Sequence, residues 1–283
     1  MQKIKMFIVC FVVLMISCQC RDAGGQQLTS QTSGGSGESS TSQPPSPITV
    51  QPAAPPTPNF DVVKLTDGRE MVRVPAGEFL RGSEEGEADE RPQKKIYVDE
   101  FLIDRYEVSN AQYAKCVAAK VCRKPTPQQG FDAPDQPVYG LSWDMANTYC
   151  RWAGLRLPTE AEWEKAARGT DGRKYPWGNE FPSSELATFS TKATSDVNSH
   201  PAGVSPYGAY NMAGNVAEWV MDWYSPTYYA SAPLKNPSGP AKGEKKILRG
   251  GSYFNAPNKL TTTYRLWENP KYNYPPYGVR CAR

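Results

Sequence analysis

Apolar positions divide the 283-residue chain into three parts. Residues 6–16 form an almost unbroken apolar run that follows Lys3 and Lys5. The run is too short to span a bilayer comfortably, and its basic start gives it the proportions of a signal peptide. Aromatic side chains are absent from residues 21–58, and regular apolar spacing returns only from Phe60 onward. We therefore predict a signal peptide over residues 1–17 and a globular domain over residues 59–283.

The segment between them, residues 18–58, is predicted to be a disordered tether. Ser, Thr, Gln, Gly and Pro dominate it. Such a composition cannot bury enough apolar surface to offset the entropy of ordering the chain. We expect this tether to connect a membrane to the domain.

Local patterns within the domain predict both strands and helices. Apolar and polar positions alternate over 71–82 and 95–103, which predicts strands. Helix signals begin at Ser109, at Ser142 and at the capping box that opens with Thr159. After Gly169 only short apolar pieces stand between turns. We predict one α+β domain, rich in loops, with about three helices.

Composition and charge narrow the class of protein. The chain has 26 Pro and 23 Gly, which favours loops over helices. The net charge is only +3, from 32 basic and 29 acidic residues, which argues against nucleic acid as a partner. His200 is the only histidine in the sequence, so a metal site built from several imidazoles is excluded.

Cys18 is a candidate lipidation site. It ends the sequence Met15-Ile-Ser-Cys, which resembles a bacterial lipoprotein cleavage site. The alternatives are ordinary secretion and an uncleaved anchor. We expect a membrane-anchored lipoprotein of the cell envelope, on its periplasmic or outer-surface face.

The domain contains four cysteines, Cys116, Cys122, Cys150 and Cys281. An even number in an exported domain suggests disulfides, and four cysteines allow three pairings. A local Cys116–Cys122 bridge would leave Cys150 to pair with Cys281. The competing interpretation is a reactive or metal-binding thiolate pair.

Several longer motifs follow one another along the domain. They read, in order, MVRVPAGEFLRGS, PVYGLSWDMANTYCRWAGLRLPTEAEWEKAARG, YGAYNMAGNVAEWVMDWY, LRGGSYF and YGVRCAR. Together they resemble the formylglycine-generating enzyme, or sulfatase-modifying factor, family. The resemblance implies a single domain with little regular secondary structure, related to C-type lectin folds. It also implies the Cys150–Cys281 bridge.

A structural calcium site is a second implication of the resemblance. Asn211 and Glu218 would supply side-chain oxygens, and Gly214 and Val216 main-chain carbonyls. Calcium prefers six to eight such oxygen ligands. The alternative is an Asn-Gly turn that leads into a Trp-rich core strand.

Copper chemistry is not expected. Copper-dependent members of the family hold Cu(I) with two cysteines after Gly-Gly-Ser, and those positions are Asn255 and Leu260 here. Neither side chain can supply a thiolate, the soft ligand that Cu(I) prefers. The iron-dependent branch needs three histidines. Ser252, Asn255 and Arg265 remain candidates for the cleft, although no base is apparent beside Ser252.

These observations favour a calcium-stabilised binding or scaffold domain whose partner is a peptide, a glycan or an envelope protein. The alternative is a formylglycine-generating (sulfatase-activating) oxidoreductase, or a related enzyme of unknown reaction. Aromatic side chains suit a binding surface because they offer large rigid faces and polar edges. The candidates for that surface are Trp223, Tyr224, Trp267, Tyr272, Tyr274 and Tyr277.

Overall fold

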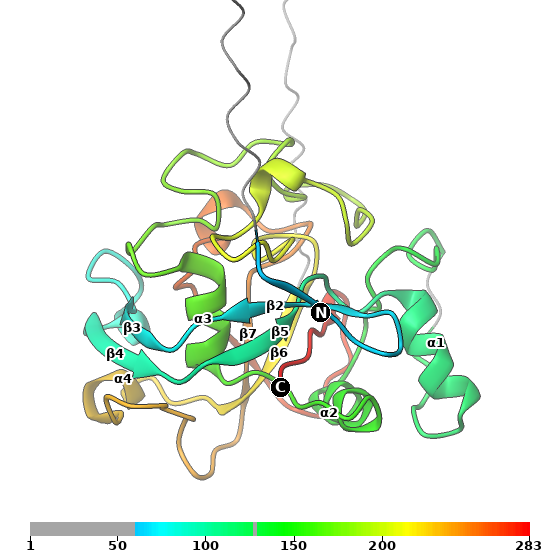
Figure 1. Ribbon diagram of the computed structural model, residues 1–283, viewed down its shortest axis with the longest axis horizontal. Coiled ribbons are helices and arrows are strands. Elements are labelled where there is room, and N and C mark those ends of the chain that lie inside the picture. The colour runs from blue at the N-terminus through cyan, green and yellow to red at the C-terminus, as the bar shows by residue number, and fades with distance from the viewer. Residues whose placement is uncertain (1–59, 127–128) are drawn as a thin grey trace, which may run out of the picture. The chain divides into compact units, whose positions relative to one another are not determined.

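Nine strands in three small sheets form the framework of the described residues (Figure 1). The structure is a computed structural model that describes residues 60–126 and 129–283. The predicted signal peptide, the tether up to Pro58 and Cys18 lie outside these residues.

Each sheet is antiparallel apart from one short parallel pair, β6 with β9. The first sheet has the order β1-β2-β5, the second pairs β3 with β4, and the third has the order β8-β7-β6-β9. The strands are β1 (Val62–Lys64), β2 (Glu70–Val74), β3 (Gly77–Arg81), β4 (Lys94–Val98), β5 (Phe101–Asp104), β6 (Ala217–Trp223), β7 (Lys246–Arg249), β8 (Leu266–Glu268) and β9 (Tyr277–Gly278).

The two predicted strands are each divided in the structure. The stretch 71–82 becomes β2 and β3, and the stretch 95–103 becomes β4 and β5, with the halves in different sheets. Pro75 follows β2 directly and has no N–H to continue a ladder. Between β4 and β5 the main-chain N–H of Asp99 donates to the side chain of Asn236 instead of to a neighbouring strand.

The three predicted helices are confirmed. Ser109, Ser142 and Thr159 each accept a hydrogen bond at the N-cap of one helix. The helices are α1 (Asn110–Ala118), α2 (Trp143–Trp152), α3 (Glu160–Arg168) and one further short helix, α4 (Tyr228–Ser231). Single 3-10 turns occupy η1 (Ala88–Glu90), η2 (Pro201–Gly203) and η3 (Pro257–Lys259). No helix in the described residues is long and apolar enough to cross a membrane.

Two hydrophobic clusters hold the elements together. One contains residues of α1, α2 and the four-stranded sheet, with Trp219 fully buried. The other joins α3 to the strands through Trp163. Accordingly, α1 contacts α2, whereas α3 contacts β3 (Figure 1). β6 was not predicted, because most of its residues are buried and it lacks the alternation of a half-exposed strand.

Both predicted disulfides are present. Cys116 bonds to Cys122 just after α1, and Cys150 of α2 bonds to Cys281. The alternative of reactive or metal-binding thiolates is therefore wrong for these four residues.

Candidate functional site

Two consecutive glycines end β7 and create a tight turn. Gly250 and Gly251 have φ values of 89° and 68°, in the left-handed region that side chains disfavour. A Cβ on Gly251 would lie 2.5 Å from the carbonyl oxygen of Lys259. The sequence therefore needs glycine here so that the chain can pass close to the segment around Lys259.

Ser252 follows this turn and is fully buried. Its hydroxyl donates to Oδ1 of Asn255 at 2.8 Å, and the main-chain N–H of Asn255 donates back to the Ser252 carbonyl at 3.0 Å. Among the described residues no carboxylate, amine or imidazole bonds to Ser252 Oγ. A serine hydroxyl acts as a nucleophile only when a base withdraws its proton. The arrangement instead ties Ser252 into a turn.

Leu260 stands where the family resemblance predicts the second copper cysteine. It is fully buried and packs in a small cluster with Tyr175 and Ala213. Asn255 offers an amide, and Leu260 offers an aliphatic side chain. A Cu(I) ion would find no sulfur ligand from either residue.

Arg265 belongs to a buried ion-pair network. Its Nε lies 2.7 Å from Oε1 of Glu160, at the start of α3, and its Nη1 donates to the Asp89 carbonyl at 2.8 Å. Arg249 joins the same network through Glu160 at 3.4 Å and also pairs with Glu164 at 2.8 Å. Of the three cleft candidates, the structure joins Ser252 to Asn255 and commits the guanidinium of Arg265 to Glu160.

The predicted calcium loop has an unusual backbone. Asn211, Gly214 and Asn215 have φ values of 51°, 83° and 58°. Asn211 Nδ2 donates to Glu107 Oε2 at 3.0 Å and to the Val197 carbonyl at 3.1 Å. Its Oδ1 is buried and has no hydrogen-bond partner among the described residues. One predicted ligand atom is thus unused.

Glu218, by contrast, has partners for both oxygens. Arg280 donates to Oε1 and Oε2, each at 2.7 Å, and Trp163 Nε1 donates to Oε2 at 2.7 Å. This carboxylate is only 1% exposed. A cation in the loop would have to share it with Arg280.

Glu107 adds a second buried carboxylate beside the loop. It accepts hydrogen bonds from the Asn215 side chain at 2.7 Å and from the Val216 main-chain N–H at 3.1 Å. Burial, and then the charge of Glu218, raise the pKa of Glu107 to about 8. Two buried carboxylates face one guanidinium, that of Arg280, so the cluster favours an additional proton or cation.

An aromatic groove lies near the Ser252 turn. Its volume is about 360 Å³, and it is lined by Thr126, Tyr139, Gly140, Tyr272, Asn273, Tyr274 and Pro275. Phe131 stacks on Tyr139 with ring centroids 4.8 Å apart and contacts Tyr253 at 5.3 Å. Because Tyr253 follows Ser252 directly, these rings link the groove to the turn.

The predicted aromatic surface is only partly assembled. Tyr272 and Tyr274 are more than half exposed and line the groove. Tyr277 is buried against Trp219 and therefore belongs to the core. Trp267 instead pairs with Tyr224, at 5.2 Å between ring centroids. The centroid of the Trp223 ring lies 3.9 Å from Lys246 Nζ.

The model of the "Sulfatase-modifying factor enzyme 1-like domain" matches residues 58–283, which is most of the chain. The chain belongs to this family. The expected fold, mixed and rich in loops with few helices, is thereby confirmed.

Named relatives of this family member include enzymes. The formylglycine-generating enzyme of Streptomyces coelicolor is 34% identical over 282 residues, which covers 76% of this chain and 89% of the relative. The serine/threonine-protein kinase pkn1 of Chlamydia caviae is 37% identical over 238 residues and covers 76% of this chain. The chain spans only 38% of the length of that relative. Among solved structures, PvdO from Pseudomonas aeruginosa has a TM-score of 0.68 and 26% identity, and the match covers 80% of this chain and 99% of PvdO.

Three residues of the loop cluster were missed by sequence reasoning. Glu107, Asn215 and Arg280 come together from distant parts of the chain. Arg280 lies in the YGVRCAR motif and Asn215 lies in the motif of the predicted calcium loop. The motifs contain both residues but do not show what they contact. Their partners lie tens of positions away, and no local spacing indicates these contacts.

Proposed function

We propose that this sulfatase-modifying factor family member is a non-catalytic binding or scaffold protein, stabilised by calcium and held in the cell envelope by a lipidated Cys18. The observation that supports it most is the state of the Gly-Gly-Ser turn. Ser252 is bonded to Asn255, and Leu260 is part of the hydrophobic core. The two positions that would bind copper thus serve the fold.

The aromatic groove is the binding surface in this proposal. Tyr272 and Tyr274 expose ring faces and hydroxyls along a groove of about 360 Å³. Rings of this kind stack on sugars and on extended peptides, and their hydroxyls add directed hydrogen bonds. The partner would be a peptide, a glycan or another envelope protein.

Capture from an envelope extract tests this surface. The wild-type chain should retain a stoichiometric ligand, and a Tyr272→Ala/Tyr274→Ala variant should lose it. Phe181→Ala is the matched control, because Phe181 is a 73% exposed aromatic that does not line the groove. Equal retention by all three proteins would argue against the groove.

A catalytic function is the second candidate, because the Streptomyces relative is named as a formylglycine-generating enzyme. The test is an assay with a sulfatase-motif cysteine peptide and Cu(I), in which that relative serves as the positive control. We expect no conversion of cysteine to formylglycine by this chain. Turnover above the metal-only background would overturn the non-catalytic proposal.

Calcium fits the loop in two respects. Asn211 has a buried Oδ1 without a partner among the described residues, and Glu107 and Glu218 lie beside the single guanidinium of Arg280, so a cation would replace the proton that Glu107 otherwise holds. Asn211 and Glu218 would offer side-chain oxygens, and Gly214 and Val216 carbonyls. Bound calcium would stabilise the loop against unfolding.

Thermal unfolding with and without a chelator tests the calcium site. The midpoint should fall when calcium is removed and recover when it is restored. Asn211→Ala should abolish that difference, whereas Glu244→Gln, an exposed residue elsewhere, should preserve it. A wild-type midpoint that is the same in both conditions would count against bound calcium.

The membrane anchor is tested by fractionation. The wild-type chain should sediment with membranes, and Cys18→Ser should move to the soluble fraction. Retention of the variant in the membrane fraction would point to an uncleaved anchor.

A further inference from the structure

A further pocket of the described residues lies apart from the calcium loop and the aromatic groove. It has a volume of about 720 Å³. One wall is the connection from β3 to β4, and the others are the end of α3 with the segment after it and η3 with the segment after it. Apart from two glycines, its lining residues all have polar side chains: Ser83, Glu84, Glu85, Gly86, Glu87, Glu90, Gln93, Arg168, Gly172, Lys174, Asn179, Asn258, Thr261 and Thr263.

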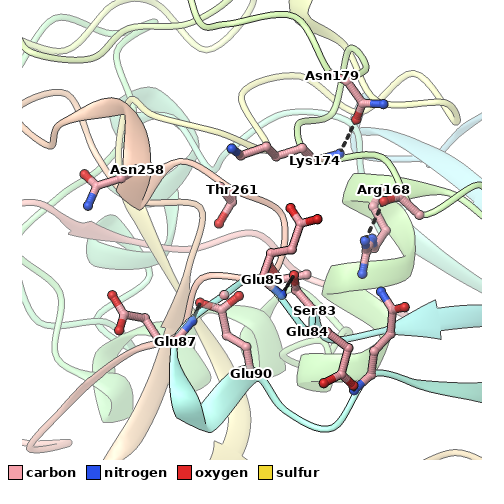
Figure 2. A pocket seen from close by; sticks show the side chains of 14 residues that line it. Ser83, Glu84, Glu85, Glu87, Glu90, Arg168, Lys174, Asn179, Asn258 and Thr261 are labelled. Atoms are coloured by element: carbon pink, nitrogen blue, oxygen red, sulfur yellow. Dashed lines mark hydrogen bonds between the residues drawn. The ribbon is translucent and has the colours of Figure 1, made fainter.

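The β3–β4 connection places four carboxylates on this pocket within seven positions. Figure 2 shows Glu84, Glu85, Glu87 and Glu90 in the lower part of the view, with Asn258, Thr261 and Lys174 above them. Glu87 has a weak ion pair with Lys259 at 3.7 Å. Among the described residues, no ion pair involves Glu84, Glu85 or Glu90.

The cations of the pocket do not balance this charge. Arg168 donates to Glu164 at 3.1 Å and to the carbonyls of Leu80, Gly82 and Gly172, so its charge is committed to the protein interior. Lys174 is an exposed cation whose Nζ lies 5.7 Å from the Tyr175 ring centroid. The pocket thus keeps a net negative charge.

Glu90 provides the independent sign of a ligand. It is 2% exposed, and its Oε1 accepts the Glu87 main-chain N–H at 3.1 Å. Its Oε2 is buried without a hydrogen-bond partner in the described part of the chain. A Cβ at position 86 would lie 2.0 Å from that oxygen, so only glycine leaves room there for the Glu90 carboxylate, and both residues line the pocket. An unpaired buried carboxylate is unfavourable unless a cation or a donor meets it.

We propose that this acidic pocket binds an extended organic cation with ammonium groups, either a lysine-rich segment of a peptide or a free polyamine. Glu85 and Glu90 receive the ammonium groups. The hydroxyl of Thr261 and the amide of Asn258 bind the remaining polar groups of the ligand.

The size and layout of the pocket select this class of ligand over a metal ion. Among the described residues that line this pocket, no three carboxylates are placed to hold a metal together. The carboxylates are instead spread along a pocket of the size that organic ligands of moderate size occupy. Ammonium groups on a chain can meet carboxylates that are separated from one another. The proposal does not depend on calcium binding or on the aromatic groove.

Titration calorimetry of the mature full chain at low salt tests the proposal with three probes. These are spermidine, a trilysine peptide with blocked termini, and the same peptide with acetylated lysines. We expect saturable binding of a charged probe and none of the acetylated peptide. Binding of trilysine alone would identify a peptide as the source of the cation, and binding of spermidine would identify a polyamine.

Three variants decide whether the pocket is responsible. Glu90→Gln should weaken binding about tenfold or more, and Glu85→Gln at least threefold. Because Glu85 is exposed, we expect Glu85→Gln to leave folding unchanged. Glu244→Gln, which removes the same charge elsewhere, should leave the affinity unchanged. The absence of saturable binding, or equal affinities in Glu85→Gln and Glu244→Gln, would overturn the proposal.

Discussion

At the scale of single residues, the Gly-Gly-Ser turn is held by packing and hydrogen bonds. Asn255 accepts a hydrogen bond from the Ser252 hydroxyl, and Leu260 packs in the core next to the turn. Gly251 makes both contacts possible, because any side chain there would meet the main chain at Lys259. The conformation of the turn therefore still depends on these particular residues, although neither predicted copper position has a thiolate.

Gly251→Ala tests whether the turn requires glycine at this position. The left-handed φ costs about 1 kcal/mol for alanine, and the contact with the Lys259 carbonyl adds to it. Denaturant unfolding should show a loss of about 2 kcal/mol or more. Gly68→Ala separates the two causes, since Gly68 has a φ of 86° but nothing within 4 Å of an added Cβ. Equal losses in the two variants would show that the contact is unimportant.

At the scale of elements, the Cys150–Cys281 bridge fastens α2 to the segment after β9. That segment also pairs with Arg156, whose main-chain N–H donates to the Ala282 carbonyl at 2.9 Å. The bond closes a loop with a sequence separation of 131, whereas Cys116–Cys122 closes one of 6. Cross-links over longer loops remove more entropy from the unfolded chain.

Paired alanine variants should separate the two bridges. Loss of Cys150–Cys281 should lower the free energy of unfolding by about 5 kcal/mol, and loss of Cys116–Cys122 by about 2 kcal/mol, in the chain-entropy model. Denaturant titration of both double variants measures the difference. A larger effect from the local bridge would contradict the assignment of the long bridge as the main cross-link.

The elements that could be predicted from the sequence are those with local signals. The starts of three helices are indicated by residues within one turn, Ser109, Ser142 and Thr159. Each of these residues is an N-cap in the structure. β6 and the breaks in the two alternating stretches depend on which strand lies alongside, which local spacing does not encode. The same limit applies to the site. Ser252 and Asn255 are near neighbours and were grouped correctly, whereas the Arg265–Glu160 pair spans 105 positions.

The molecule as a whole buries several acids that favour the protonated state. Burial raises the pKa of Glu107 to about 8, of Asp222 to about 7 and of Asp104 to about 6. In each case the folded protein holds a proton that the unfolded chain releases at lower pH. The stability that these groups contribute is present at acidic pH and is lost as the pH rises through the folded pKa values.

In chelator, the free energy of unfolding should therefore fall between pH 5 and pH 8. One pKa unit corresponds to about 1.4 kcal/mol, so the fall should reach at least that value. Glu107→Gln should make the fall smaller, and Glu244→Gln should not. Chemical denaturation at a series of pH values measures these slopes. Stability that rises over this interval, or an unchanged slope in Glu107→Gln, would refute the assignment.

The segment Arg280–Ala282 has a consequence for how the polypeptide is made. Arg280 neutralises Glu218, Cys281 anchors α2, and Ala282 completes bridges to Ile103 and Arg156. Every partner of this segment leaves the ribosome earlier than the segment itself. The nascent chain must therefore wait, with Glu218 and Cys150 unmatched, until translation has passed residue 282. The fold of the domain can therefore be completed only after residue 282 has been synthesised.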